Sequence, residues 1–305
     1  MLRTWMPLGL VAALWLVTGG QEAQAKVRVV ATVPTLAALA AEVGGEHVEV
    51  VTLAGPNEDP HYVDARPDYV LRVNKADLLV LVGLELEVGW LPSLQTSGRN
   101  AAVNVGGRGY FDASAYITPL EVPTRRIERS EGDIHPGGNP HYLYDPGYAA
   151  RVASALGERL AALDPANEEA YLARADALVA TLERLRREQR ARFAELSAER
   201  RAVVSYHASM VYLTQWLALR EVMQIEPRPG ISPDPGHVAK VRVAMKEQAV
   251  KVIIQEAYYP SATSKKLADL AGGTVVVIDG GPRFSQGESY VSYVQRVVDE
   301  LFQAL

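Results

Sequence analysis

The run Asp77-Leu78-Leu79-Val80-Leu81-Val82-Gly83 indicates how this chain folds, because it is apolar almost without interruption. A strand of this kind is covered on both faces, as in a parallel sheet between two layers of helices. The flanking sequence fits such a sheet. It alternates apolar strands with helices, and predicts strands at residues 27–33 and 48–53 and helices at residues 34–43 and 67–75. This alternation predicts an α/β lobe.

The second half of the chain repeats the pattern. A fourth strand of the first half is expected at residues 101–105, and residues 106–140 follow as a long segment rich in Gly, Pro and charge, which we expect to be a flexible loop. The second half predicts strands at residues 202–206, 221–225, 250–255 and 274–278, with helices at 210–219, 236–248, 261–271 and 288–305. We therefore predict two α/β lobes, each with a mostly parallel four-stranded sheet flanked by helices.

A long helix is expected to join the two lobes. Residues 146–163 are helical in pattern, and Asp164-Pro165 resembles a helix cap followed by proline at the first helical position. The helix that follows, about residues 166–200, has an apolar stripe broken at Gln189 and would be roughly 50 Å long. The predicted organisation is a first lobe at residues 26–163, a linking helix at 164–200 and a second lobe at 201–305.

The composition excludes several classes of function. The chain has 305 residues, a net charge of -5 and no long basic run, so nucleic acid is not an expected partner. It has no cysteine, which excludes disulfides, thiol catalysis and cysteine-ligated metal. Any site for a transition metal must therefore use His, Asp or Glu side chains.

The first 25 residues resemble a secretion signal. Arg3 gives a positive start, residues 6–17 are apolar, and Ala23-Gln24-Ala25 supplies the small-x-small pattern before a cut at Lys26. The alternative is a membrane anchor, but an apolar run of 12 residues is shorter than the roughly 20 that span a bilayer. We expect the segment to be cleaved and the mature protein to be exported and soluble.

Four candidate metal ligands lie where predicted elements end in loops. His61 and Asp279 follow strands, His207 ends a strand, and His141 lies between Pro140 and Pro146, which limit the backbone on both sides. Ligands of parallel α/β lobes bind beyond the carboxyl ends of the strands. Since two candidates come from each half, we expect a metal site of three nitrogens and a carboxylate in the cleft between the lobes.

The chain resembles the periplasmic metal-binding proteins of zinc and manganese ABC importers, the ZnuA/TroA-like family. The resemblance runs in order along the mature chain, through Asp59-Pro60-His61, Asn139-Pro140-His141-Tyr142-Leu143-Tyr144-Asp145-Pro146, Ser205-Tyr206-His207, Gly230-Ile231-Ser232-Pro233, Val252-Ile253-Ile254-Gln255-Glu256 and Asp279. It implies that His61, His141, His207 and Asp279 are the metal ligands. It also implies two lobes joined by one rigid helix, a periplasmic location and an ABC permease as partner. We expect the protein to be a monomer.

Zinc is the expected metal. Imidazoles and a carboxylate suit tetrahedral zinc, and manganese-selective members of the family tend to carry a carboxylate where this chain has His207. A manganese-binding member is the alternative. Many zinc-binding members also have a His-rich acidic loop. In this chain, residues 106–140 contain only one histidine, His135. His135 is either an accessory ligand or a solvated loop residue, and the short supply of histidine leaves room for loading by a periplasmic metallochaperone.

Other acidic residues have two interpretations each. Glu58 is an extra ligand or shapes its loop, and Glu256 orients a histidine or ends a strand without a role in the site. Asp145 is expected to be a helix cap rather than a ligand. Two other classes of function are alternatives to metal transport. A zinc hydrolase with three histidines and a water is disfavoured because no His-Glu-x-x-His or Gly-x-Ser-x-Gly motif is present. A surface adhesion protein on the same fold is the third class.

Overall fold

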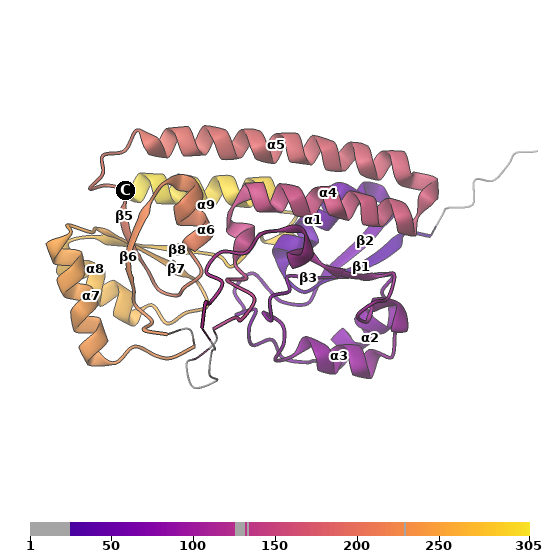
Figure 1. Cartoon of the computed structure of the whole chain (residues 1–305), viewed down its shortest axis with the longest axis horizontal. Helices are drawn as coiled ribbons and strands as arrows, with labels where there is room; N and C mark the ends of the chain where they lie inside the picture. The colour runs from indigo at the N-terminus through magenta and orange to yellow at the C-terminus, as the bar shows by residue number, and fades with distance from the viewer. Residues whose placement is uncertain (1–24, 126–131, 133, 229) are drawn as a thin grey trace, which may run out of the picture.

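The computed structural model describes residues 25–125, 132, 134–228 and 230–305. This part of the chain forms two α/β lobes that lie side by side under one long helix (Figure 1). Each lobe has a four-stranded sheet whose neighbouring strands are all parallel, and the strand orders are β2-β1-β3-β4 and β6-β5-β7-β8. The strands are β1 (Val27–Ala31), β2 (Val48–Thr52), β3 (Leu78–Leu81), β4 (Tyr110–Asp112), β5 (Ala202–Ser205), β6 (Arg220–Gln224), β7 (Val252–Glu256) and β8 (Thr274–Ile278). The predicted repeat of one α/β pattern is confirmed.

Strand β3 is buried along its whole length, as its sequence predicts. Leu78 and Val80 face one core cluster, and Leu79 and Leu81 face another, because successive side chains of a strand point to opposite faces. The first cluster includes side chains of α1 (Pro34–Gly44), and the second includes those of α2 (Pro67–Lys75) and α3 (Leu91–Gly98). Helices therefore cover both faces of this sheet.

The prediction of the fourth strand was wrong. Residues 101–105 begin with a short 3-10 helix, η2 (Ala101–Val103), because the Asn100 side chain accepts a hydrogen bond from the Ala102 N–H and donates to carbonyls at the end of α2. The strand is β4, which lies inside the segment 106–140 that was expected to be irregular. Gly109 brings β4 against its neighbour, since a Cβ at this position would lie 2.1 Å from the Asp77 carbonyl oxygen.

The linking helix is shorter than predicted. Helix α4 (Pro146–Leu163) has its predicted bounds, but α5 covers Glu168–Ala194, about 40 Å, rather than residues 166–200. A 3-10 turn, η6 (Pro165–Asn167), precedes it, because Asp164 accepts hydrogen bonds from Asn167 and from the Tyr171 hydroxyl instead of capping the backbone. After Ala194 the chain continues in turns up to β5.

Helix α5 contacts both lobes. It packs along α1 and α4 of the first lobe and against α6 (Val211–Leu217) and α9 (Tyr290–Ala304) of the second. The polar break in its stripe, Gln189, is buried and lies within hydrogen-bond distance of Gln295 on α9. One core cluster extends through side chains of both lobes. The remaining face of the second sheet is covered by α7 (Pro235–Glu247) and α8 (Ala262–Ala271).

Within the described ranges, no helix is long and apolar enough to cross a membrane. The predicted secretion signal covers residues 1–25, of which residues 1–24 lie outside the part of the chain that the structure describes.

Glu87 is a buried carboxyl in the first lobe, with 3% of its surface exposed. It accepts hydrogen bonds from the Thr32 hydroxyl and from the Val82 and Gly83 N–H groups, which fixes the loop after β3. Burial raises the pKa of Glu87 to about 7, against the three hydrogen bonds that lower it.

We expect this carboxyl to make stability depend on pH. The folded protein keeps a proton that the unfolded chain releases above about pH 4.5, so the free energy of unfolding is highest at low pH and falls as the pH rises towards about 7. The loss amounts to about 3 kcal/mol. Chemical denaturation of the wild type and of Glu87→Gln at pH 5 and pH 7.5 tests it: the variant is less stable overall but shows a smaller decrease. Exposed Glu85→Gln is the control, and equal decreases in wild type and Glu87→Gln would contradict the prediction.

Candidate metal centre

Three histidines meet where the two lobes face each other. His61 lies in the loop after β2, His141 begins the turn η5 (Tyr142–Tyr144), and His207 follows β5. All three are buried, and each offers a ring nitrogen within 4.8 Å of the others. Their ring centroids are 5.3, 5.5 and 5.6 Å apart. In the part of the chain that the structure describes, these three histidines form the group of side chains close enough to hold one metal ion. They are three of the four predicted ligands.

Asp59 orients His61. One carboxylate oxygen of Asp59 accepts the His61 backbone N–H at 3.0 Å and lies 2.7 Å from ring Nδ1. An acceptor at Nδ1 places the ring proton there and leaves Nε2 with a lone pair for a metal. Burial alone would raise the pKa of Asp59, but its contacts with His61 hold that pKa below the usual range. The carboxylate is therefore charged beside the ring.

Glu226 has the same relation to His207 in the second lobe. Its carboxylate lies 2.5 Å from His207 Nδ1, and both side chains are almost fully buried. Burial lowers the pKa of His207, yet the hydrogen bond and charge of Glu226, with the charge of Glu256, raise it above its usual value overall. The ring thus presents Nε2 to the other two histidines with its orientation fixed.

His141 is held through its backbone instead of its ring. The Asn139 side chain accepts the His141 N–H at 3.0 Å. Three nearby carbonyls accept hydrogen bonds from the second lobe: Asn139 from the Tyr212 hydroxyl, Leu143 from the Tyr290 hydroxyl, and Tyr144 from Trp216 Nε1. The segment that carries His141 is therefore attached to α6 and α9. Burial and the neighbouring histidines keep the pKa of His141 well below its usual value, so its ring is neutral.

Asp279, the fourth predicted ligand, lies at the end of β8 and is buried, but its carboxylate is bonded to arginines. Its Oδ2 accepts from Arg283 Nε at 2.9 Å and from Arg296 at 3.0 Å. It does not belong to the group of donors within 4.8 Å. The structure thus brings together the three histidines and gives Asp279 other partners.

His135 lies closer to the site than a solvated loop residue would. Its Nε2 is 3.3 Å from Nε2 of His61. Two nitrogens that share a tetrahedral zinc at about 2.0–2.1 Å are roughly 3.3 Å apart. A pocket of about 220 Å³ adjoins this contact and is lined by Glu121, Ile134, His135, Asn139, Pro140, His141, His207, Ala208 and Gln224. His135 therefore lines the same pocket as two of the three buried histidines.

The other acids have distinct contacts. Glu58 accepts the Gly55 N–H at 3.1 Å, as expected of a residue that shapes its loop, and Asp145 caps α4 and pairs with Arg186. Glu256 is fully buried and bonds to the Ser209 hydroxyl and, at 3.4 Å, to that of Tyr144, while its Oε2 has no hydrogen-bond partner among the described residues. Burial raises the pKa of Glu256.

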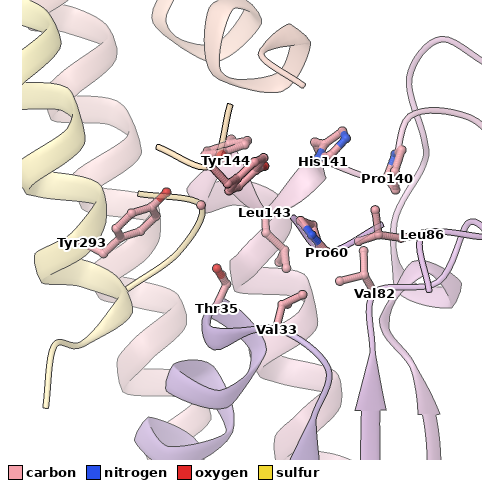
Figure 2. A pocket seen from close by; sticks show the side chains of 12 residues that line it. Val33, Thr35, Pro60, Val82, Leu86, Pro140, His141, Leu143, Tyr144 and Tyr293 are labelled. Atoms are coloured by element: carbon pink, nitrogen blue, oxygen red, sulfur yellow. The ribbon is translucent and has the colours of Figure 1, made fainter. Parts of the chain in front are cut away.

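A small cavity of about 40 Å³ lies next to His141 (Figure 2). Val33 and Val82 of the first lobe and Tyr293 of α9 line it, with Leu143 and Tyr144 beside the histidine. Apolar and tyrosine side chains from both lobes therefore border His141 on this side, and the polar pocket with His135 borders it as well.

Sequence reasoning missed the partners of the histidines. Glu226 follows β6 and could have been found by the strand-end argument that selected His207. Asp59 lies only two residues before His61 in the motif Asp59-Pro60-His61, and this closeness is a signal that it could orient the ring. Arg296 carries no signal in the sequence, because its contact with Asp279 depends on how α9 lies beside β8. Arg283 lies only four residues after Asp279, so the spacing of these two residues could have indicated their pairing.

Known proteins share both the sequence and the fold. Curated relatives include the high-affinity zinc uptake protein ZnuA of Bacillus subtilis (24% identity, 100% of this chain, 99% of that protein), the manganese ABC transporter lipoprotein PsaA of Streptococcus pneumoniae (21%, 94% and 92%) and the iron-binding protein YfeA of Yersinia pestis (24%, 90% and 85%). These relatives are named for zinc, manganese and iron respectively, so they do not fix the metal of this chain.

Solved structures confirm the fold. A crystal structure of ZnuA superposes with a TM-score of 0.77 at 24% identity over 92% of this chain and 99% of that one. The laminin-binding protein Lmb of Streptococcus agalactiae, described as an adhesin with metal-transporting activity, gives 0.75 at 22% identity over 91% and 99%.

The family profile described as "Zinc-uptake complex component A periplasmic" matches residues 29–304. Together with the parallel lobes, the long helix and the buried histidines, this match shows that the chain belongs to the ZnuA family of metal-binding substrate-binding proteins of ABC transporters, which has zinc, manganese and iron members.

Proposed function

We propose that this protein captures Zn²⁺ in the periplasm and delivers it to the permease of an ABC importer. The observation that carries the proposal is the meeting of three buried imidazoles, His61, His141 and His207, within 4.8 Å of one another. Two of them have a carboxylate on Nδ1, which leaves Nε2 to bind the ion. The family profile and the transporter relatives support the role in transport.

The donor set supports zinc over manganese. Imidazole nitrogen suits zinc, whereas manganese prefers carboxylate, carbonyl and water oxygen and binds most weakly in the divalent series. Three nitrogens leave one position of a tetrahedron. We assign that position to Asp279. A manganese site would instead need more oxygen donors, and Glu58 and Glu256 are the acids that the sequence suggests for this role. His135 is a further candidate because of its contact with His61.

No enzymatic step belongs to this proposal. The acids beside the histidines are bonded to ring nitrogens, serine or tyrosine rather than placed as a base for an attacking water. A four-ligand site also keeps no open position for substrate. We further propose that the protein works as a monomer and that a periplasmic metallochaperone can load it. The buried histidines favour metal binding over the alternative of a surface adhesion protein.

Metal competition tests the proposal directly. The mature chain, residues 26–305, is stripped of metal and then offered zinc and a large excess of manganese. We expect one equivalent of zinc to be retained, because nitrogen donors favour it. Retention of manganese would contradict the zinc assignment, and the absence of tight binding of any metal would contradict the function as a whole.

Loss of a histidine should remove most of the affinity. We expect His141→Ala to weaken zinc binding by more than about 100-fold, because even removal of a group that only orients a ligand costs 10–100-fold. Chelator competition measures the dissociation constant, and a thermal unfolding curve checks that the variant is folded. His47→Ala, a histidine outside the site, is the control. An unchanged dissociation constant in His141→Ala would exclude it from the ligand set.

Orientation of His207 by Glu226 can be separated from ligation. Glu226→Ala removes the acceptor on Nδ1, so the ring can turn or bind through the wrong nitrogen, and we expect affinity to fall by about 10–100-fold. Glu226→Gln keeps an acceptor oxygen and should lose less. Exposed Glu247→Ala on α7 is the control. Equal effects of the Ala and Gln variants would show that charge, not orientation, is what Glu226 contributes.

A further inference from the structure

Asp279 has partners that a metal ligand would have to give up. We propose that Arg283 and Arg296 are positioning residues that compete with the metal ion for this carboxylate and thereby set how tightly the ion is held and how fast it leaves. The inference rests on the proposed function, in which Asp279 completes the site. Its basis is the geometry around a single buried carboxylate.

Both arginines contact the same oxygen of Asp279. Arg283 Nε lies 2.9 Å and an Arg296 terminal nitrogen 3.0 Å from Oδ2. Only 8% of the Asp279 residue surface is exposed. Hydrogen bonds between charged groups are stronger than neutral ones, and more so where water is excluded. This carboxylate is therefore well satisfied without a metal.

The backbone of Asp279 is fixed, so any change of partner must be a side-chain movement. The Tyr293 hydroxyl donates to the Asp279 carbonyl at 2.8 Å, and the next residue, Gly280, donates its N–H to the Pro56 carbonyl of the first lobe at 2.7 Å. Asn57, with its amide oriented to donate, lies 3.0 Å from Asp279 Oδ1. The backbone that carries this carboxylate is therefore hydrogen-bonded to both lobes.

The two arginines are not equivalent. Arg296 is also paired with Glu288 at 2.9 Å and lies over the ring of Tyr293, so it is held in place. The Arg283 side chain is about half exposed, and the Asp279 carboxylate is the ion-pair partner found for it. Arg283 can turn into solvent when Asp279 leaves it. We therefore expect Arg283 to give up the Asp279 carboxylate to the ion more readily than Arg296 does.

If the arginines support Asp279 instead of competing with the ion, the change in zinc affinity on removing one has the opposite sign. If the arginines instead supported Asp279 from behind while it bound the ion, removing one would weaken the site, as loss of an orienting group does. If they compete, removing one lowers the cost of moving Asp279 and strengthens the site. The direction of the change in affinity therefore separates the two roles.

The experiment compares zinc affinity and release in matched variants. The mature protein is loaded with zinc alone, and a fluorescent chelator reports the dissociation constant and the rate of release for wild type, Arg283→Gln, Asp279→Ala and the double variant. Arg184→Gln, on the exposed face of α5, makes the same change of charge away from the site. We expect Arg283→Gln to bind about fivefold more tightly and to release zinc correspondingly more slowly, the size of a partly exposed ion pair.

The double variant distinguishes competition from a general effect. In the Asp279→Ala background Arg283 has no carboxylate to hold, so adding Arg283→Gln should change neither affinity nor release. Arg184→Gln should match wild type, and Arg283→Lys should fall between wild type and Arg283→Gln because it keeps a charge but loses the planar geometry of the guanidinium.

Several results would overturn the inference. Weaker zinc binding in Arg283→Gln, or the same gain with and without Asp279, would exclude competition. A wild-type protein that binds zinc tightly while Arg283→Gln behaves identically would sink this inference and leave the proposed function intact. A wild-type protein that binds no metal would overturn the proposed function itself.

Discussion

The proposed metal centre depends on a carboxylate that is hydrogen-bonded to each of two facing imidazoles. Asp59 fixes the ring of His61 in the first lobe, and Glu226 fixes that of His207 in the second. A buried imidazole without such a partner can adopt either tautomer and can rotate, and it can then present the wrong nitrogen. The two pairs also bring negative charge close to the place where a dication would bind, which offsets the loss of water around it.

The third histidine connects the lobes. His141 belongs by sequence to the first lobe, but carbonyls of its segment accept hydrogen bonds from Tyr212, Trp216 and Tyr290 of the second. The shared core cluster and α5 hold the lobes in the same relation. Movement between the lobes would therefore break hydrogen bonds next to the site. The proposed exchange of partners at Asp279 would need only a side chain to move, which suits release of an ion from a molecule whose lobes are hydrogen-bonded together.

The same local rules placed the elements correctly where sequence neighbours decide them. The apolar run around β3, the proline at the start of α4 and the repeat of strand and helix in each half all predicted what is observed. The errors came where distant contacts decide. Asn100 turned an apparent strand into η2 through hydrogen bonds to the end of α2. Asp164 Oδ2 accepts hydrogen bonds from Asn167 and Tyr171, and α5 begins later than its sequence suggested.

The hydrophobic pattern of the chain shows where each strand stops, and this selected His61, His207 and Asp279 as candidates in the loops at strand ends. His141 was selected by its position between Pro140 and Pro146. The contacts that each of these side chains makes depend instead on the folded chain. His61 and His207 converge because two separate sheets point their carboxyl ends at one interface, and His141 joins them because its segment is hydrogen-bonded to α6 and α9. Asp279 meets Arg296 because α9 returns beside β8, whereas Arg283 lies only four residues after Asp279 in the loop that follows β8. Apart from the pair with Arg283, these contacts join residues far apart in the chain, and no local pattern encodes their distances.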